Sequence, residues 1–377
     1  FPLLVCVSRN SATGGCPVKS SFDPNCQLLA AQYLRRQCKQ LSGQIDGLRD
    51  GSDIESVHRA RVASRRMRAA LGIFRDCFPD ANLARWQKQV GKLTKGLGKA
   101  RDLDVQREYL VGALSRLQQP ESFSGIARLL VRTELARDKR QWRVCDAVDR
   151  LGQSGVVTEM LSATKAVLKG PDDEVSVSSP SVLGLASEHI GGRLAELLAY
   201  QTSLEDPHDL RQHHAMRIAA KGLRYTMEVY KPCYGGRLDD SLNAVKQIQT
   251  LLGDLHDCDV WIERLPLMLE KERVRIVRRY GHAGPLERLE PGVRHLFDER
   301  RQQRQSLFCQ LQDFWREQAE CGTWERLEAV VRGDEAAAPT SRPTIRMDMP
   351  PAESPAPAPA TAPVGAMECS TNDRADI

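Results

Sequence analysis

Two stretches of the chain, residues 57–75 and 213–231, share an unusual pattern that limits the fold more than any other feature. The first reads VHRARVASRRMRAALGIFR and contains no proline, no acidic residue and a single glycine. Alanine, methionine and arginine favour helix. On a helical wheel the basic residues fall on one side and the apolar residues on the other. The second stretch reads HHAMRIAAKGLRYTMEVYK and repeats both sides. We predict two helices that each bury one face and present a row of cations on the other.

The two stretches belong to a longer internal repeat. They align at a shift of 156 positions, and the segment LGKARDLDV at 97–105 aligns with LGDLHDCDV at 252–260 at a shift of 155. Two matches in the same order at nearly the same shift indicate a duplication. The aligned pairs are His58 with His214, Arg61 with Arg217, Arg65 with Lys221, Arg68 with Arg224, Asp102 with Asp257, and Asp104 with Asp259.

Helical spacing of apolar residues continues through most of the chain, and no segment has a convincing strand pattern. We therefore predict an all-α protein of two similar four-helix units. The predicted helices are 24–48, 57–78, 82–117 and 124–149 in the first half, and 182–201, 213–231, 239–279 and 291–331 in the second. The predicted organisation is an irregular segment over 1–22, a first half over 23–169, a linker over 170–181, a second half over 182–332, and a disordered Pro/Ala-rich tail over 333–377.

Composition excludes several classes of protein. The chain contains no run of 18 or more apolar residues, so we expect no membrane span and no membrane partner. Its eleven cysteines are an odd number without C-x-x-C pairs, which favours reduced thiols in a cytoplasmic protein over a disulfide framework or a zinc site. The segment KGLGKA lacks the spacing of a phosphate-binding loop. We predict no cofactor and no catalytic residue.

The basic rows point to an anionic ligand. Ordinary solvated helix faces mix charges of both signs, but here like charges occupy neighbouring turns, which destabilises a helix by a few tenths of a kcal/mol, roughly, per pair. An anion would neutralise that repulsion, and arginine suits phosphate because its planar fork donates two parallel hydrogen bonds. The candidate residues are His58, Arg61, Arg65, Arg66, Arg68, His214, Arg217, Lys221 and Arg224, with Lys92, Lys95 and Lys99 on the second helix and Arg132 and Lys139 on the fourth.

Histidines and aspartates of the repeat raise the alternative of a metal site. Against it, Arg101 occupies in the first copy the place of His256 in the second, and arginine does not ligate metals. We therefore predict no metal, and we interpret four carboxylates as partners that hold the arginines in position. These are Asp102, Asp104, Asp257 and Asp259.

The duplicated pattern H-x-x-R-x-x-x-[RK]-x-x-R followed by L-G-x-x-[RH]-D-x-D-V resembles the CHAD domain, the conserved histidine α-helical domain, over about residues 24–320. The resemblance implies two four-helix bundles related by a pseudo-twofold, whose basic helices line a central cleft or pore that binds inorganic polyphosphate. It also implies a non-catalytic protein, with association with polyphosphate granules in some members. This chain departs from the pattern at Gly222, which stands where the first copy has Arg66. Its second half is also less basic, because Asn243, Gln247, Thr250 and Asp254 replace the lysine row.

Three alternatives stay open from the residues alone. A nucleic-acid binder is disfavoured because only 5% of the chain is aromatic and no helix-turn-helix pattern is present, so we expect no specific nucleic-acid partner. A metal-dependent enzyme or accessory acting on phosphoanhydrides would need the four aspartates as its metal ligands. A scaffold that docks an acidic protein is the third alternative, and a homo-oligomer is left open with each.

Overall fold

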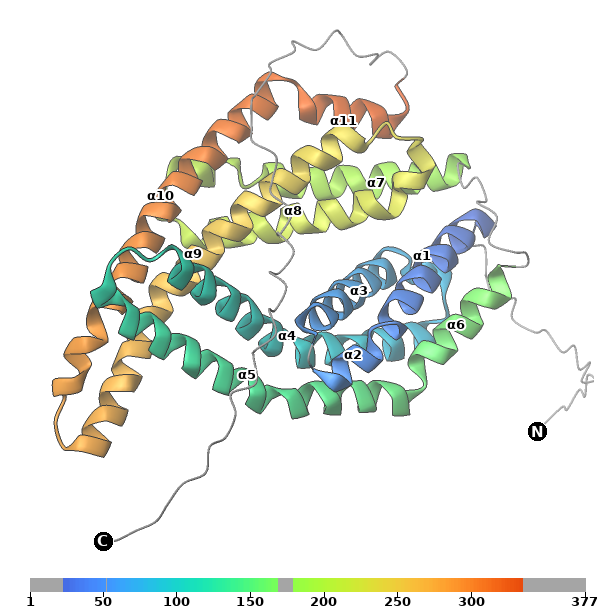
Figure 1. The fold of residues 1–377 in the computed structure, drawn as a ribbon. Helices are drawn as coiled ribbons and strands as arrows, with labels where there is room; N and C mark the ends of the chain where they lie inside the picture. Colours follow the sequence, from blue (N-terminus) through green and yellow to red (C-terminus); the bar gives the residue numbers. More distant parts are fainter. Residues whose placement is uncertain (1–22, 52, 169–178, 335–377) are drawn as a thin grey trace, which may run out of the picture. The chain divides into compact units, whose positions relative to one another are not determined.

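The computed structural model describes residues 23–51, 53–168 and 179–334. In this part of the chain every regular element is a helix, so the all-α prediction is confirmed (Figure 1). The predicted irregular segment 1–22, residues 170–178 of the predicted linker and the tail from residue 335 lie outside the described residues.

The described residues of the first half form six α-helices. They are α1 (Pro24–Ser42), α2 (Ile45–Asp50), α3 (Ile54–Ile73), α4 (Asp80–Arg116), α5 (Pro120–Ser154) and α6 (Val156–Val167). Side-chain caps start two of them, because Asp23 accepts from the Asn25 amide before α1 and Asp53 accepts from the Glu55 amide before α3. The helix predicted over 24–48 divides at Gly43, and the short α2 packs instead on α3 and α5.

The second half contains five helices. They are α7 (Pro180–Leu198), α8 (Leu210–Tyr230), α9 (Asp239–Tyr280), α10 (Glu290–Glu320) and α11 (Thr323–Arg332). The Asp209 side chain caps α8 by accepting from the Gln212 amide at 3.0 Å. The helix predicted over 291–331 divides at Gly322, whose φ of 65° is left-handed and ends α10.

Both halves pack their helices in the same order. In the first half α1, α3, α4 and α5 pack in succession, and α6 returns to cover α1; in the second half α7, α8, α9 and α10 do the same, and α11 returns to α7. The returning helix is an addition to the four predicted for each half. Each one follows a glycine with φ 65°, Gly155 and Gly322, which stand 167 positions apart. The duplication therefore extends to the turn before the last helix.

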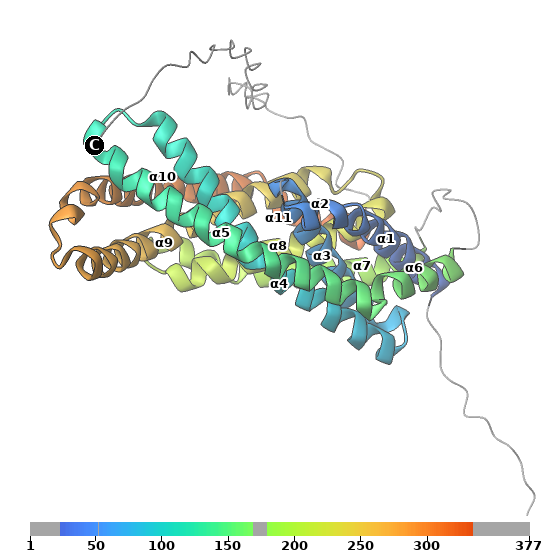
Figure 2. The ribbon, with the colours of Figure 1, turned by 60° about the horizontal axis from the view of Figure 1, so that its bottom comes forward.

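The two halves join through equivalent positions of the repeat. Helix α3 packs against α8, where Phe74 meets its equivalent Tyr230 edge-to-face with ring centroids 5.9 Å apart. Helix α5 packs against α10 (Figure 2). At this contact Gly125 meets Gly292, which lies 167 positions later, the same shift that separates Gly155 from Gly322. Contacts between equivalent residues are what a pseudo-twofold relation requires.

Two hydrophobic cores hold the halves together. The larger is a single cluster with members in both halves, including the fully buried Trp86 and Tyr230. The smaller lies where α4, α5, α9 and α10 meet, and it again contains an equivalent pair, Leu110 and Leu265. Because burying apolar surface is the main stabilising term, the halves form one cooperative body and not two independent bundles.

Candidate anion-binding site

The predicted apolar faces of the two cationic helices are buried. On α3 the side chains of Ala60, Met67 and Leu71 are almost fully buried, and on α8 the equivalent side of the helix is also buried through Met216 and Leu223. The basic side chains are therefore held on the opposite side of each helix, where they are half-buried or exposed.

The glycine of the L-G-x-x-[RH]-D-x-D-V motif lies next to an arginine in each repeat. A Cβ on Gly98 would lie 3.4 Å from Nη1 of Arg61, and one on Gly253 would lie 3.9 Å from Nε of Arg217. Arg61 Nη1 also donates to the Thr94 carbonyl at 3.1 Å, so α4 orients this guanidinium. Helices α4 and α9 thus each place a glycine beside an arginine of the cationic helix, Arg61 of α3 or Arg217 of α8.

Cations from both repeats converge around Lys221. Burial, followed in order of effect by the charges of Arg65, Arg217, Arg61 and Arg224, lowers the pKa of Lys221 to about 8. Burial also lowers the pKa values of Arg61 and Arg217, each with a contribution from Arg65. We call these five residues, Arg61, Arg65, Arg217, Lys221 and Arg224, the central cluster. The α3–α8 contact brings them together from positions about 156 apart in the chain.

The first aspartate of each motif lies beside the central cluster. Asp102 acts electrostatically on Arg61, and Asp257 acts on Arg217. The surrounding protein raises the pKa of the Asp257 carboxyl, Arg217 and Arg300 lower it, and the charge of Asp102 raises it. The equivalent residues Asp102 and Asp257 are thus close enough to repel each other.

The second aspartate of each motif bonds to the next long helix of its own half, which is α5 in the first half and α10 in the second. The Asp104 carboxylate is fully buried and accepts from Nε of Arg137 at 2.6 Å. Its equivalent Asp259 accepts from Nε of Arg304. Arg137 and Arg304 lie 167 positions apart, like Gly155 and Gly322, and are therefore equivalent. The same bond thus joins α4 to α5 in the first half and α9 to α10 in the second. These two carboxylates therefore bond to arginines of α5 and α10 and not to those of the cationic rows.

Each repeat histidine flanks the central cluster from its own half. Burial and the charge of Arg101 lower the pKa of His58, and Arg101 acts on Arg61 as well. The exposed His214 stacks on His256, with ring centroids 4.6 Å apart. Burial, Arg217 and His214 lower the pKa of His256. Arg101 and His256 are equivalent positions, so both histidines reach the cluster through the same position of the motif.

The sequence of the chain matches the model of a known protein family. Residues 32–266 match the model of the CHAD domain. The chain belongs to the CHAD domain family.

Relatives of this CHAD protein include uncharacterised proteins from two strains of Mycobacterium tuberculosis, CDC 1551 / Oshkosh and H37Rv. Each is 29% identical over 224 residues, which is 56% of this chain but only 40% of the relative. The crystal structure of the CHAD domain from the plant Ricinus communis aligns with a TM-score of 0.51 at 20% identity, covering 81% of this chain and 91% of that one. PptA from Streptomyces chartreusis aligns with a TM-score of 0.47 at 17% identity, covering 76% and 99%. The plant structure supports the all-α CHAD fold.

Three predicted ligand residues of the CHAD domain, Arg66, Arg224 and Arg132, form ion pairs with glutamates. Arg66 of α3 lies 3.1 Å from Glu228 of α8, which also accepts from Arg224 at 3.1 Å. Arg132 of α5 bonds at 2.8 Å to Glu272 of α9. Glu272 lies fifteen residues beyond Asp257, about 22 Å along the helix. The structure thus places Arg132 in a bond between the halves and away from the central cluster, contrary to its predicted role in a shared basic surface.

The lysine row on α4 extends the basic surface of the CHAD domain outward. Lys92, Lys95 and Lys99 are exposed, and no carboxylate of the described residues lies within ion-pair distance of any of them. Arg68 of α3 is also exposed, and its Nε would lie 3.8 Å from a Cβ on Gly91 of α4. Lys139 is exposed on α5.

Four residues near the site were absent from the predicted set. Tyr225 acts electrostatically on both Arg61 and Arg217, so it lies between the two repeats. Arg300 stacks on Tyr109 with its guanidinium carbon 3.5 Å from the ring centroid, and it also lies near Asp257. Glu228 bridges Arg66 and Arg224. Arg101 was identified only as a position that argues against a metal. The sequence signal available for Arg101 was that it is a basic residue at the motif position that His256 occupies in the other repeat. Nothing in the local sequence marks Tyr225, Arg300 or Glu228.

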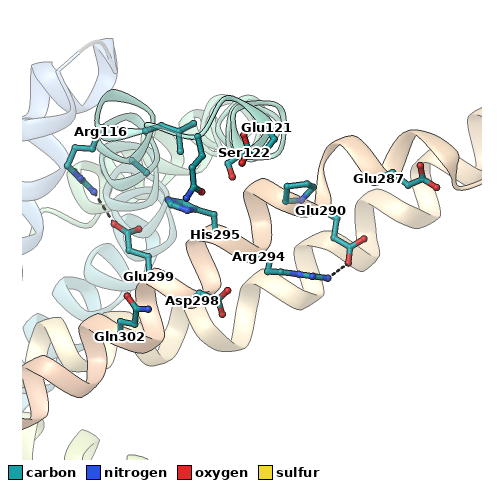
Figure 3. Close-up of a pocket in the computed structure, with 14 residues that line it drawn as sticks. Arg116, Glu121, Ser122, Glu287, Glu290, Arg294, His295, Asp298, Glu299 and Gln302 are labelled. Carbon is teal, nitrogen blue, oxygen red and sulfur yellow. Dashed lines mark hydrogen bonds and ion pairs between the residues drawn. The ribbon is translucent and has the colours of Figure 1, made fainter.

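One other hollow of the described residues carries a different balance of charge. The cavity in Figure 3, of about 830 Å³, lies between the end of α4, the start of α5 and the start of α10. Both of its arginines are paired with carboxylates, Arg116 at 3.5 Å from Glu299 and Arg294 at 2.8 Å from Glu290. Five carboxylates line this cavity against two arginines, and an excess of negative charge disfavours a polyanion.

The described residues form neither a metal site nor a membrane span. No group of three or more histidine, cysteine, aspartate or glutamate side chains in this part of the chain is arranged to hold a metal ion. The cysteines placed by the structure are all free thiols. None of the described helices combines the length and the apolar composition needed to cross a membrane.

Proposed function

We propose that the protein binds inorganic polyphosphate without catalysing its turnover, through the central cluster and the lysine row of α4. The observation that carries the proposal is the crowding of Lys221 by four arginines from both repeats. Like charges held this close in a half-buried position repel one another, and a polyanion relieves that cost when it binds. The family membership supports the same ligand, because polyphosphate is the ligand that the resemblance to the CHAD domain implies.

The chemistry of the cluster favours polyphosphate over nucleic acid. Polyphosphate consists of repeating anionic groups with no bases, so cations alone satisfy it. Single-stranded nucleic acid gains much of its affinity from aromatic stacking. Tyr225 is the aromatic residue that acts on the cluster, and its neighbour Arg224 already stacks on its ring at 5.3 Å. A chain of phosphates running from the cluster along Lys92, Lys95 and Lys99 would meet cations over its whole length.

A competition assay tests the proposal. Long polyphosphate should displace labelled single-stranded DNA and RNA across a salt series, and its own affinity should fall steeply as salt rises. Arg65→Glu combined with Lys221→Glu should remove polyphosphate binding while leaving the helical content unchanged. A matched control is Lys39→Glu with Lys165→Glu, which changes the net charge equally at exposed positions of α1 and α6. Equal binding by the two double variants would refute the assigned site.

The proposal that the protein is not an enzyme has its own test. Asp102 and Asp257 lie together beside the cluster and are the carboxylates best placed to act in phosphoanhydride hydrolysis. We expect no phosphate release when the protein is incubated with polyphosphate and magnesium. Release that disappears in Asp257→Asn would favour the enzymatic alternative. Association with polyphosphate granules follows from the binding proposal and would be measured as co-sedimentation with granules that the Arg65→Glu, Lys221→Glu variant loses.

A further inference from the structure

A second surface, separate from the central cluster, lies in the groove between α5 and the distal part of α9. The groove holds a cavity of about 260 Å³, and its floor and sides are largely apolar. Leu103 of α4 and Leu129 of α5 contribute on one side, and Leu267 and Met268 of α9 contribute on the other. A cavity of this size with apolar walls accommodates one large apolar side chain and not a chain of hydrated phosphates.

Cations surround this apolar cavity. Arg132, Arg264, Lys271 and Arg275 line it, and Glu272 is the single acidic residue among its lining side chains. Glu272 is 2% exposed and already bonded to Arg128 and Arg132 at 2.8 Å each, and to Arg275. Burial alone would raise the pKa of Glu272, but the hydrogen bonds from Arg132, Arg128 and Arg275 lower it below its usual value. One carboxylate cannot neutralise three guanidinium groups, so the groove keeps an excess of positive charge.

Two of these cations lack a carboxylate partner among the described residues. Arg264 and Lys271 are exposed, and no described carboxylate lies within ion-pair distance of either one. They stand seven residues apart, two turns along the same side of α9. Both cations are therefore available to pair with carboxylates of another molecule.

Exposed apolar side chains continue from the cavity along α9. Leu267 is 54% exposed, and Val274 and Val277 follow it at spacings of seven and three on the solvent side of the helix. This spacing presents a stripe of the kind that packs against another helix. Exposure of an apolar stripe to water is unfavourable. The unpaired cations beside the stripe favour a partner that carries acidic residues.

We propose that the α5–α9 groove docks an acidic amphipathic helix of a partner protein, which inserts one leucine- or phenylalanine-like side chain into the cavity. The aspartates or glutamates beside that anchor pair with Arg264 and Lys271, and a second apolar residue packs on Val274 and Val277. Helix-in-groove recognition of this kind uses apolar anchors at helical spacing for affinity and surrounding charge for specificity. This inference does not depend on polyphosphate binding, because it uses different residues.

The experiment uses the full chain and a labelled synthetic helical peptide with leucines at positions i, i+3 and i+7 and glutamates on the flanking positions. Two matched peptides carry serine in place of the central leucine or lysine in place of the glutamates. Fluorescence anisotropy should detect binding of the first peptide, with affinity reduced at least about tenfold for each of the other two. Equal binding of the three peptides would overturn the proposal.

Variants of the chain locate the binding site. Arg264→Glu with Lys271→Glu should weaken the peptide about tenfold or more, because both acid–base pairs become repulsive. Leu267→Ser should weaken it severalfold through the lost apolar contact. The matched controls Lys39→Glu with Lys165→Glu, and Val111→Ser at an exposed apolar position of α4, should leave the peptide affinity unchanged. Circular dichroism checks that each variant keeps its helices.

Two further outcomes separate other occupants. If long polyphosphate displaces the peptide from the wild-type chain and the Arg65→Glu, Lys221→Glu variant no longer binds the peptide, the peptide occupies the central cluster and the docking proposal fails. If the chain binds phosphatidylglycerol vesicles through Arg264 and Lys271 but binds none of the peptides, the groove serves a lipid surface and the proposal also fails.

Discussion

Gly125 of α5 and Gly292 of α10 are equivalent positions of the repeat, and they face each other where the two helices cross. A Cβ on Gly292 would lie 2.9 Å from Cα of Gly125 and would overlap the Ser122 carbonyl oxygen, while a Cβ on Gly125 would overlap the Leu289 carbonyl oxygen. No real Cβ sits so close to another backbone. The two halves can therefore approach this closely only because neither position carries a side chain.

Alanine at either glycine should destabilise the protein. The new methyl group meets backbone and not a flexible side chain, so α5 and α10 must separate, at a cost of about 1–3 kcal/mol. Urea or thermal unfolding measures the loss. The control is Gly192→Ala on α7, where a Cβ meets nothing within 4 Å and alanine should stabilise the helix by up to about 1 kcal/mol. Equal effects at Gly125 and Gly192 would show that the close crossing is absent.

Polyphosphate affinity should fall as pH rises through the pKa of Lys221. That pKa is lowered to about 8, so in the free protein Lys221 loses its proton as pH rises through this value, while its arginine neighbours stay charged. We expect a loss of about fivefold between roughly pH 7 and pH 9, since one charge-assisted contact disappears. Lys221→Arg, which copies the residue found at Arg65 in the other repeat, should bind with almost no pH dependence over the same range.

The same pKa shift predicts the sign of a stability effect in the absence of ligand. An unfolded chain keeps Lys221 protonated up to about pH 10.5, so between about 8 and 10.5 the unfolded state binds more protons than the folded state. The contribution of Lys221 therefore makes the folded protein more stable as pH rises through this window, and its cost is fully present below pH 8. Chemical unfolding of wild type and Lys221→Met at several pH values measures the difference. A difference that does not change with pH would contradict the crowded environment of Lys221.

Glu228→Gln should tighten polyphosphate binding while weakening the junction between the halves. Glu228 neutralises Arg66 and Arg224 together, so its removal frees positive charge beside the central cluster. It also leaves two partly buried guanidinium groups without their carboxylate, which costs about 1–3 kcal/mol of stability. Isothermal titration with polyphosphate and urea unfolding should change in these opposite directions. A variant that binds polyphosphate more weakly would mean that Glu228 positions the arginines for the ligand.

Arg132→Gln should leave polyphosphate binding within about twofold of wild type, in contrast to Arg65→Gln, which should weaken it about tenfold. Arg132 bonds to Glu272 at a distance from the central cluster, so its loss affects the contact between α5 and α9 instead. Glu272 keeps Arg128 and Arg275, and the stability loss should be about 1 kcal/mol. Titrations of both variants at one salt concentration make the comparison. Strong weakening by Arg132→Gln would extend the ligand surface to α5.

Much of the helical plan was predictable because it depends on local pattern. The helix predicted over 82–117 and the observed α4 (Asp80–Arg116) agree closely, as do the prediction over 239–279 and α9 (Asp239–Tyr280). The breaks were harder. Gly322 ends α10 in the left-handed conformation, but a glycine in a periodic segment reads equally well as a tolerated interior residue, and only the packing of α11 on α7 decides between the two.

For the site, the sequence by itself determined which residues are cationic, that they share one face of each helix, and that the pattern occurs twice. Those facts follow from helical periodicity and from a repeat that can be aligned without coordinates. Only the tertiary structure decided which cations are left for a ligand. Glu228 and Arg66 are far apart along the chain, and so are Glu272 and Arg132, so no local pattern could pair them. The crowding of Lys221 likewise exists only because α3 and α8 pack together, since charges interact through space according to their distance and burial and not their separation along the chain.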